Sequence, residues 1–322
     1  MQHRLTVYLE TYEIMRKKMK WVSDPKFVMT AASFYAMNEK PFDISRYWNL
    51  AESIKKQAGL FSLIRSESRY ITAAMLDVSF DQPETMIPVF FSAYDDLIDA
   101  KFQRSIFTYI AAAVLMKQTG SEPDTYRPAI QKAKQIYDGM KKEHRIITSA
   151  EDYPLAVLLA SKGPGNVIER NERFYEHLNR FGFQKGNHLQ MLSHILTLDE
   201  ENHPDVLINR TIQVFDSFKE AGIKQKTLFY PIMGMLAMIP PSELDMKHVA
   251  WIYEQLNQTK PFKWQKDLNT TLAASFFVKD RLENSSLIET SLNTTIETIL
   301  QAQQAAVTAA ITASASTSGS GD

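Results

Sequence analysis

The feature that most constrains the fold is one short segment that recurs at a fixed spacing. The segments 102–104 (Phe-Gln-Arg), 183–185 (Phe-Gln-Lys) and 264–266 (Trp-Gln-Lys) follow one another at 81 residues, and one further step back reaches Trp21. Weaker equivalents lie between these marks, at Phe61, Ile146 and Ile223. The underlying period is therefore about 40 residues, which is typical of repeats built from two helices.

The residues downstream of these marks also recur. A tyrosine follows most marks by seven to nine residues and opens a stretch of small and branched apolar residues; these are Tyr70, Tyr109, Tyr153 and Tyr230. Ala-Ala-Ser-Phe occurs at both 31–34 and 273–276. Small residues let helices approach closely, so one packing geometry is indicated throughout. We expect each tyrosine ring in the core with its hydroxyl bonded to a neighbouring helix, the alternative being a ligand groove.

Helix boundary signals agree with this period. Five glycines close amphipathic stretches, and three prolines stand near helix starts, where a missing amide proton is tolerated. The glycines are Gly59, Gly120, Gly163, Gly182 and Gly222, and the prolines are Pro25, Pro83 and Pro204. Ser242 with Asp245 predicts a further helix start. Sustained period-two alternation, the mark of strands, is missing from the sequence.

We therefore predict an all-α fold, an α-solenoid or superhelix of about seven two-helix repeats. The expected hairpins are 2–38, 42–80, 83–120, 123–163, 166–198, 204–239 and 241–283. The alternative is a closed α/α toroid whose inner helices surround a pocket, since periodicity alone does not separate the two.

The domain organisation follows from the same pattern. Residues 1–283 form the helical-hairpin repeat domain, 284–313 a long C-terminal helix that caps the last repeat and protrudes, and 314–322 a disordered Ser/Thr/Ala/Gly tail. An apolar stripe runs along the expected helix from Ile288 to Ile311. That helix would be about 40 Å long at 1.5 Å per residue.

Composition limits the cellular compartment and the class of binding partner that we expect. Lys plus Arg (36) balances Asp plus Glu (37), which argues against a nucleic-acid-binding protein with a long basic face. The chain has no cysteine, which suits a reducing compartment and excludes thiol chemistry. Charged residues interrupt the N-terminal apolar positions, and the apolar runs are too short to span a bilayer. We expect a cytoplasmic protein without a membrane segment.

One region resembles a known family. Its residues are 61–65 (Phe-Ser-Leu-Ile-Arg), Arg69, Tyr70, 73–78 (Ala-Ala-Met-Leu-Asp-Val) and Phe80. This stretch is similar to the most recognisable region of domain-of-unknown-function family 4003, which is associated with Gram-positive, Bacillus-like bacteria. The resemblance extends over about residues 8–292. It implies a bacterial cytosolic protein and brings no catalytic or ligand residues with it.

Sequence signals for catalysis or metal binding are weak. Glu200 and His203 match half of a di-iron motif, but they precede Pro204 at an expected helix start. His188 and His194 are six residues apart, so they face different sides of one helix. Asp96 and Asp99 share a helix face and could act as acid and base only within a pocket. We therefore predict no catalytic residues, no metal ligands and no cofactor.

The most informative anomaly is a set of cations near helix starts. Arg104, Lys185 and Lys266 lie in or just before the first turn of a second helix, where positive charge opposes the helix dipole at a cost of about 0.3–1 kcal/mol each. Arg65 and Arg69 lie in the comparable region of the second hairpin. One explanation is an intramolecular carboxylate on the preceding hairpin. The other is a ladder of cations that binds an acidic peptide or another anion.

These observations favour a non-enzymatic protein-binding scaffold or adaptor, whose partner is another protein or an acidic peptide. The predicted binding residues are Arg65, Arg69, Arg104, Lys185 and Lys266. The apolar stripe from Ile288 to Ile311 offers a contact for a homodimer. Two alternatives stay open: an enzyme on an α/α toroid that uses carboxylates and tyrosines of its inner helices, and a weak binder of RNA or single-stranded DNA through a basic edge.

Overall fold

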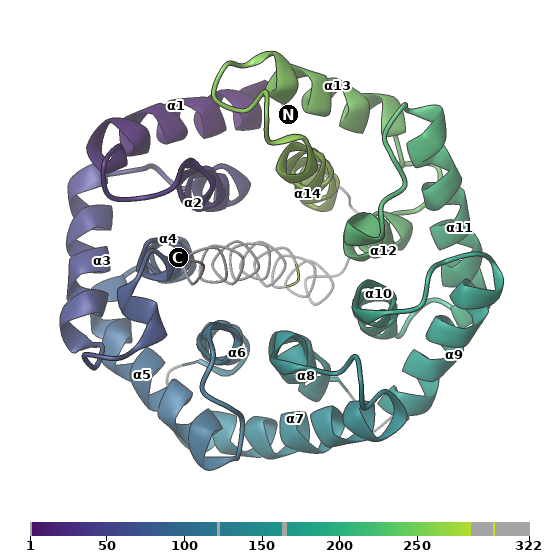
Figure 1. The fold of residues 1–322 in the computed structure, drawn as a ribbon, viewed down its shortest axis with the longest axis horizontal. Coiled ribbons are helices and arrows are strands. Elements are labelled where there is room, and N and C mark those ends of the chain that lie inside the picture. The colour runs from purple at the N-terminus through teal and green to yellow at the C-terminus, as the bar shows by residue number, and fades with distance from the viewer. Residues whose placement is uncertain (1, 121–122, 163–165, 285–298, 300–322) are drawn as a thin grey trace, which may run out of the picture. The chain divides into compact units, whose positions relative to one another are not determined.

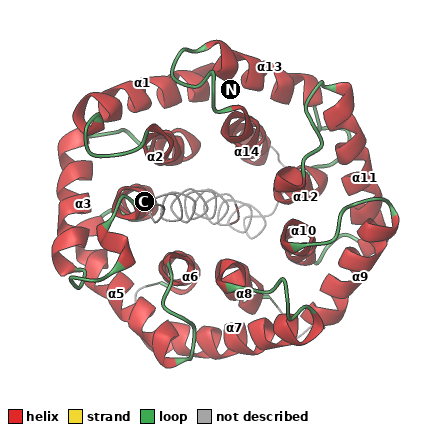
Figure 2. Ribbon diagram, viewed as in Figure 1, coloured by secondary structure: helices red, strands yellow, loops and turns green. Residues whose placement is uncertain are grey.

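The computed structural model describes residues 2–120, 123–162, 166–284 and 299, and within them every regular element is a helix (Figure 2). This confirms the all-α prediction. None of the described helices is both long enough and apolar enough to cross a membrane. The expected C-terminal helix 284–313 and the tail 314–322 lie outside the described residues, except for Asn284 and Ile299.

The contacts divide the chain into two compact units. The N-terminal unit comprises the described residues of Gln2–Asp138 and Thr148–Ser161, and the C-terminal unit comprises those of Gly139–Ile147 and Lys162–Ile299. The boundary runs through one long helix, α7 (Pro123–Glu143).

Helices of the N-terminal unit alternate between two layers (Figure 1). We call one the amphipathic layer: α1 (Gln2–Met19), α3 (Ile44–Gln57), α5 (Pro83–Asp99) and most of α7. We call the other the apolar layer: α2 (Pro25–Asn38), α4 (Ser68–Ser79), α6 (Ile106–Thr119) and α8 (Tyr153–Ala160). Short 3-10 turns, η1 (Leu63–Arg65) and η2 (Ala150–Asp152), lead into α4 and α8.

The C-terminal unit alternates in the same way. Its amphipathic layer contains α9 (Val167–Arg180), α11 (Pro204–Glu220) and α13 (Met246–Gln258). Its apolar layer contains α10 (Asn187–Thr197), α12 (Tyr230–Met238) and α14 (Lys266–Asn284), and the 3-10 turn η3 (Thr227–Phe229) precedes α12. The fourteen described α-helices thus fall, two by two, in the seven stretches expected from the sequence, although α14 ends one residue beyond the last stretch.

The two layers follow from residue pattern. In α1 the buried residues include Leu5, Tyr8, Tyr12 and Met15, the three- and four-residue spacing of an apolar stripe. In α8 and α12 every residue is buried, so these helices are apolar on all sides. Neither α8 nor α12 contains a charged residue.

Small residues bring helices of the apolar layer close together. Gly234 of α12 faces α10 so closely that an added Cβ would lie 2.5 Å from a methyl carbon of Leu192. The Ala-Ala-Ser-Phe segments at 31–34 and 273–276 lie in α2 and α14, and all their residues are at most 1% exposed. These segments are buried packing surfaces in their respective units, as their composition indicates.

Helix ends follow local signals. Pro25, Pro83 and Pro204 are each the first residue of a helix, as predicted. The expected Ser242 and Asp245 start signal is corrected: Asp245 is itself the N-cap of α13, and its side chain accepts from the main-chain N–H groups of Lys247 and His248. Gly163 lies outside the described residues.

One helix-ending arrangement occurs three times. After α5, α9 and α11 a residue with positive φ (Lys101 at 72°, Gly182 at 97° and Gly222 at 71°) is followed by a buried apolar residue. The main-chain N–H of that apolar residue donates to the carbonyl five positions earlier, at 2.8–3.1 Å; the three pairs are Phe102–Leu97, Phe183–Leu178 and Ile223–Phe218. This is the Schellman geometry, in which the apolar residue folds back onto the helix end.

Trp264, the third aromatic residue of the series spaced by 81 residues, is not buried like Phe102 and Phe183. This corrects the prediction that the three positions are equivalent. Trp264 is 81% exposed, and Phe262 is the buried aromatic residue in that link. Because α13 ends at the extended residue Thr259 and a turn from Thr259 to Phe262 follows, the buried ring comes two residues before the mark. Three other marks are also exposed: Trp21, Phe61 and Ile146.

Candidate binding site

A hollow on the surface of the N-terminal unit has a volume of about 640 Å³. It is lined by residues 57 and 59–63, from the end of α3 to the start of η1, and by Phe91, Tyr94 and Asp95 of α5. Arg104, in the link before α6, and Tyr109 of α6 complete the lining. We call this hollow the aromatic pocket.

Two stacked tyrosines line the aromatic pocket. The rings of Tyr94 and Tyr109 lie 3.8 Å apart at an interplanar angle of 7°, and the Tyr109 hydroxyl shares a hydrogen bond of 2.7 Å with the Ser62 hydroxyl. Burial raises the pKa of Tyr94 above its ordinary value, the adjacent Tyr109 raises it further, and Arg104 acts in the opposite direction. Tyr94 therefore stays neutral and acts as a hydrogen-bonding group rather than as a base.

The rim of the aromatic pocket exposes apolar side chains. Leu60 is 80% exposed, Phe61 99% and Leu63 56%. Single exposed apolar residues are ordinary on a protein surface, but three within four positions beside a hollow make this rim a candidate interaction site. Gly59 ends the preceding stretch, so the run lies in a link rather than on the buried side of a helix.

One predicted cation lies in this pocket. Arg104 is exposed and, among the described residues, makes no hydrogen bond or ion pair. Asp95 of α5 lines the same hollow and is exposed as well. The pocket therefore combines an apolar rim with one positive and one negative side chain.

Arg65 and Arg69, which were also predicted to bind a partner, make intramolecular contacts. Arg65 donates to the Ala58 carbonyl at 2.9 Å, just after α3. Arg69 donates to the Tyr70 hydroxyl at 2.7 Å, lies 3.7 Å from the Glu52 carboxylate and stacks over the Tyr70 ring. Arg69 is thus compensated by a carboxylate within the chain, as one of the two explanations expected. That carboxylate, Glu52, belongs to the same hairpin as Arg69 and not to the preceding one.

Lys185 and Lys266 lie in the C-terminal unit. Both are exposed, and among the residues the structure describes neither has an intramolecular carboxylate partner. The carboxylate of Asp267, next to Lys266 in the sequence, pairs with a different cation. It lies 2.6 Å from the ammonium nitrogen of Lys226. Whether Arg104, Lys185 and Lys266 act together stays a prediction.

The repeated tyrosines have structural roles. The Tyr153 hydroxyl accepts the Gln103 main-chain N–H at 3.2 Å, and the Tyr230 hydroxyl accepts the Gln184 N–H at 3.1 Å. The rings also contact the preceding mark, with Phe102–Tyr153 centroids 4.8 Å apart and Phe183–Tyr230 centroids 4.9 Å apart. Each tyrosine thus ties the start of one apolar-layer helix to the link of the preceding pair.

A buried carboxylate in the N-terminal unit is also structural. Asp77 of α4 is 2% exposed; it accepts from the Tyr35 hydroxyl at 2.7 Å and pairs with Arg46 at 3.0 Å and Lys40 at 3.5 Å. Lys40 also donates to the Phe80 carbonyl at 3.1 Å. Two cations at the C-terminal end of α4 suit the helix dipole, so this cluster fastens α2 and α3 to that end.

A histidine cluster occupies the C-terminal unit. His144 lies 2.8 Å from the Glu172 carboxylate, and its ring packs against Tyr175 at a tilt of 42°, whereas His194 of α10 is fully buried. Burial, with a smaller contribution from His144, lowers the pKa of His194 to about 3. His194 is therefore a neutral core residue at physiological pH.

The remaining candidates lie outside the pocket. His203 is the N-cap of α11 and contacts Asp205, as expected for a helix start. Asp99 is exposed and Asp96 is partly exposed, and neither lines the aromatic pocket. Sequence reasoning missed the exposed rim around Phe61, whose only signal was an apolar run directly after a helix-ending glycine.

Comparison with known proteins places the chain among related sequences. The family described as "Protein of unknown function (DUF4003)" matches residues 11–305, which confirms the resemblance found in the sequence. The chain is similar to the uncharacterized protein YeaA of Bacillus subtilis (strain 168), with 36% identity over 291 residues that cover 89% of this chain and 87% of the relative. No solved structure matches.

Proposed function

This chain belongs to the DUF4003 family of bacterial proteins, and we propose that it is a non-enzymatic scaffold that binds a segment of another protein. The observation that carries the proposal is the aromatic pocket, with its exposed apolar rim and its cation without a partner among the described residues. The bound segment is an extended peptide that places an apolar side chain against the rim and a carboxylate beside Arg104.

The rim supplies the apolar part of the binding free energy. Burying a Leu or Phe side chain contributes about 1.5–3 kcal/mol, so Leu60, Phe61 and Leu63 together contribute roughly 5–9 kcal/mol. Association and ordering cost about 4–15 kcal/mol, which offsets most of this gain. The rim contacts alone therefore leave little net free energy of binding, so a short peptide should bind weakly unless further contacts, such as one with Arg104, add to them.

The charges of the pocket favour a peptide over a nucleic acid. A carboxylate beside Arg104 would form a charge-assisted hydrogen bond, which contributes about 1.5–3 kcal/mol. Asp95 in the same pocket repels a chain of phosphates but tolerates one well-placed carboxylate. A protein segment with a single acidic residue next to an apolar one fits this arrangement.

For the whole chain, we propose that the helix pairs continue as an α-solenoid of two-helix repeats. The alternation of two layers within each unit and the recurrent Schellman ends support repeated stacking. Small-angle X-ray scattering of the purified protein tests this, because an open superhelix and a closed α/α toroid of the same mass differ in their maximum dimension.

The cytoplasm is the proposed location of this scaffold. A sequence without cysteine fits a reducing compartment. Fractionation of a Bacillus-type cell that expresses a tagged copy checks this, with recovery in the membrane or secreted fraction as the contrary result.

The binding proposal is tested by selecting from a random peptide library displayed on phage against the full-length protein. Affinities of enriched peptides are then measured by calorimetry with Phe61→Ser and Arg104→Glu. Binding should fall at least tenfold in each variant, since each removes more than about 1.4 kcal/mol of contact. Phe181→Ser and Lys224→Glu are matched controls, because Phe181 is also exposed (61%) and Lys224 is also an exposed cation, and neither lines the pocket.

Three outcomes contradict the proposal. A library that yields no enriched peptide does so, and so do affinities that Phe61→Ser and Arg104→Glu leave unchanged. Binding of a single-stranded 20-nucleotide RNA at low salt that Arg104→Glu abolishes would instead support the nucleic-acid alternative.

A further inference from the structure

A second exposed group of apolar and basic side chains lies in the N-terminal unit, where α1 ends. Trp21 is 87% exposed and Val22 48%, and both belong to the link between α1 and α2. Three exposed lysines come just before them: Lys17, Lys18 and Lys20. We call these five residues the basic patch. The helix dipole accounts for lysines near the end of α1, but an indole ring in water gains nothing from it.

The lysines of the basic patch lie over aromatic rings rather than beside carboxylates. The ammonium nitrogen of Lys20 lies 4.8 Å from the centre of the Trp21 ring, and that of Lys18 lies 5.1 Å from the centre of the Trp48 ring. Within the part of the chain that the structure describes, none of the three lysines forms an ion pair. A cation over an exposed ring is only weakly stabilised, so these positive charges can still pair with a carboxylate.

Two acidic side chains of this region are already engaged with the main chain. The Asp24 carboxylate accepts the main-chain N–H of Lys26 at 2.8 Å and caps α2. The Glu67 carboxylate accepts the main-chain N–H of Asp24 at 2.5 Å. On α1, Glu13 lies one turn before Lys17. The basic patch therefore keeps an excess of positive charge.

The hydrogen bond between Asp24 and Glu67 also sets the basic patch next to the aromatic pocket. Asp24 ends the link between α1 and α2, and Glu67 ends the link that carries the rim residues Leu60, Phe61 and Leu63. The two links therefore touch, and the helices that follow them, α2 and α4, pack against each other. Packed helices lie about 8–10 Å apart, and an extended chain advances about 3.3–3.6 Å per residue. About three residues of a bound peptide thus reach from the rim to the patch.

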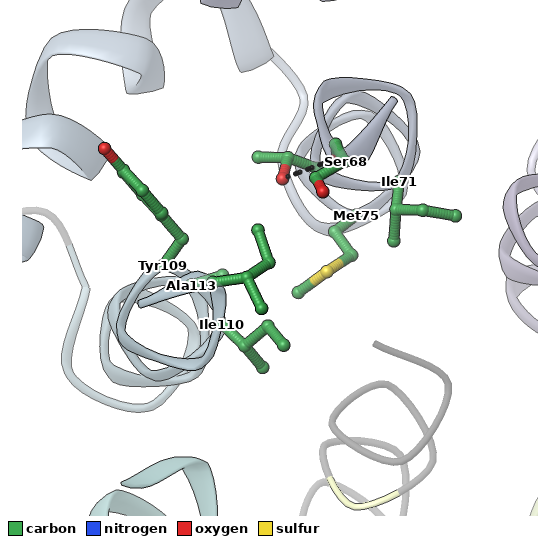
Figure 3. A pocket seen from close by; sticks show the side chains of 8 residues that line it. Ser68, Ile71, Met75, Tyr109, Ile110 and Ala113 are labelled. Atoms are coloured by element: carbon green, nitrogen blue, oxygen red, sulfur yellow. Dashed lines mark hydrogen bonds between the residues drawn. The ribbon is translucent and has the colours of Figure 1, made fainter. Parts of the chain in front are cut away.

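A peptide on the rim has no comparable path between the helices beneath it. The hollow between α4 and α6 has a volume of only about 10 Å³, room for one water molecule at most. Figure 3 shows Met75 and Ile110 beside this hollow, and the ring of Tyr109, which also lines the aromatic pocket, directed away from them. A peptide anchored on the rim therefore continues over the links rather than between α4 and α6.

We propose that the basic patch is a second subsite for the segment that binds the aromatic pocket, and that it takes further acidic residues. This inference rests on the proposed function and adds the chemistry of the flanking residues. Since α4 packs between α2 and α6, the rim lies between the basic patch and Arg104. The segment thus carries a carboxylate beside Arg104, an apolar side chain on the rim and, about three to six residues further along, acidic residues beside the lysines.

The test lengthens a peptide enriched in the phage selection and measures its affinity for the full-length protein by calorimetry. Gly-Gly-Glu-Glu-Glu is added at one end or the other, and Gly-Gly-Gln-Gln-Gln extensions are the uncharged reference. In about 50 mM salt the Glu extension at one end should raise the affinity about fivefold or more over its reference, because carboxylates then lie beside exposed lysines. In about 500 mM salt the gain should fall below about twofold, since salt screens exposed charges.

Substitutions in the basic patch assign the gain to it. A triple variant with Lys17→Gln, Lys18→Gln and Lys20→Gln should abolish the gain and leave the affinity of the unextended peptide unchanged. Trp21→Ser should reduce the gain about twofold, because Lys20 loses the ring over which it lies.

A second triple variant is the matched control. Lys219→Gln, Lys224→Gln and Lys247→Gln remove the same charge from exposed positions of the C-terminal unit, and this protein should keep the full gain. Circular dichroism of both triple variants checks that the helices are retained.

The results that overturn this inference differ from those that overturn the proposed function. A Glu extension without gain, or a gain that the patch variant keeps, overturns the subsite, while Phe61→Ser still weakens the unextended peptide. An affinity that Phe61→Ser leaves unchanged, or a library without enriched peptides, overturns both. Binding to phosphatidylglycerol vesicles that the patch variant abolishes, with no gain from the Glu extension, would identify an anionic membrane surface as the partner and overturn the subsite.

Discussion

Two aromatic residues at comparable positions have opposite environments. Phe61 and Phe102 each follow an amphipathic-layer helix of the N-terminal unit and each precede an apolar-layer helix, 41 residues apart. Phe61 is 99% exposed, whereas Phe102 is 3% exposed and contacts Tyr153. The sequence pattern alone treats them as equivalents.

Local backbone geometry at the helix end accounts for the difference. After α5, Lys101 adopts a φ of 72°, and Phe102 turns back so that its N–H reaches the Leu97 carbonyl. After α3, Ala58 is extended and the chain enters a turn in which Ser62 bonds back to Gly59. A Schellman end directs the next apolar residue into the core, and an extended end leaves it in solvent, where it is available to bind a partner.

The largest expected effect is on stability. Phe102→Ala should lower the free energy of unfolding by about 3–5 kcal/mol, because it removes a buried ring and leaves a cavity. Phe61→Ala should change it by less than about 0.5 kcal/mol, since the ring is in water already. Urea unfolding followed by circular dichroism measures both. Equal losses in the two variants would mean that Phe61 is also part of the core.

A smaller effect is expected at the tyrosines of the following helices. Tyr153→Phe leaves the part-buried Gln103 N–H without its acceptor and should cost about 1–2 kcal/mol. Tyr109→Phe should cost no more than about 0.5 kcal/mol, because the Ser62 hydroxyl can turn to water in the open pocket. The same urea titrations measure these losses, with Tyr253→Phe as a control in α13. A larger loss at Tyr109 than at Tyr153 would contradict this ranking.

The smallest effect concerns the two helix ends themselves. Lys101→Gly should raise the free energy of unfolding by about 0.4–1 kcal/mol, because glycine adopts positive φ without strain. Gly59→Ala should not lower stability, since Gly59 lacks positive φ and an added Cβ would meet no atom within 4 Å. Thermal melting measures both changes. Destabilisation by Lys101→Gly would show that the Lys101 side chain, rather than its backbone, fixes this end.

Much of the fold could be predicted because its signals are local. Proline at the first turn, aspartate or serine caps and apolar stripes at helical spacing define each helix without reference to distant residues. Pro25, Pro83 and Pro204 illustrate this, since each begins the helix that the sequence indicated. The equivalence of Trp264 with Phe102 failed, because it depends on how α13 ends rather than on spacing.

The candidate site was less predictable. Arg104 was identified by its unfavourable place before a helix, and it does line the aromatic pocket. Arg65 and Arg69 carried the same signal but contact Ala58, Glu52 and Tyr70 instead. A sequence shows that a charge is badly placed for its own helix, but the compensating partner comes from elsewhere in the fold.

The all-helical class, the pairing of short helices and the membership of the DUF4003 family can all be read from the amino-acid sequence, since these depend on composition, periodicity and similarity along the chain. Which aromatic residues are buried, and which form the rim of the aromatic pocket, becomes visible only in the folded chain. The reason is that burial depends on the direction in which the backbone leaves each helix, and two or three dihedral angles set that direction.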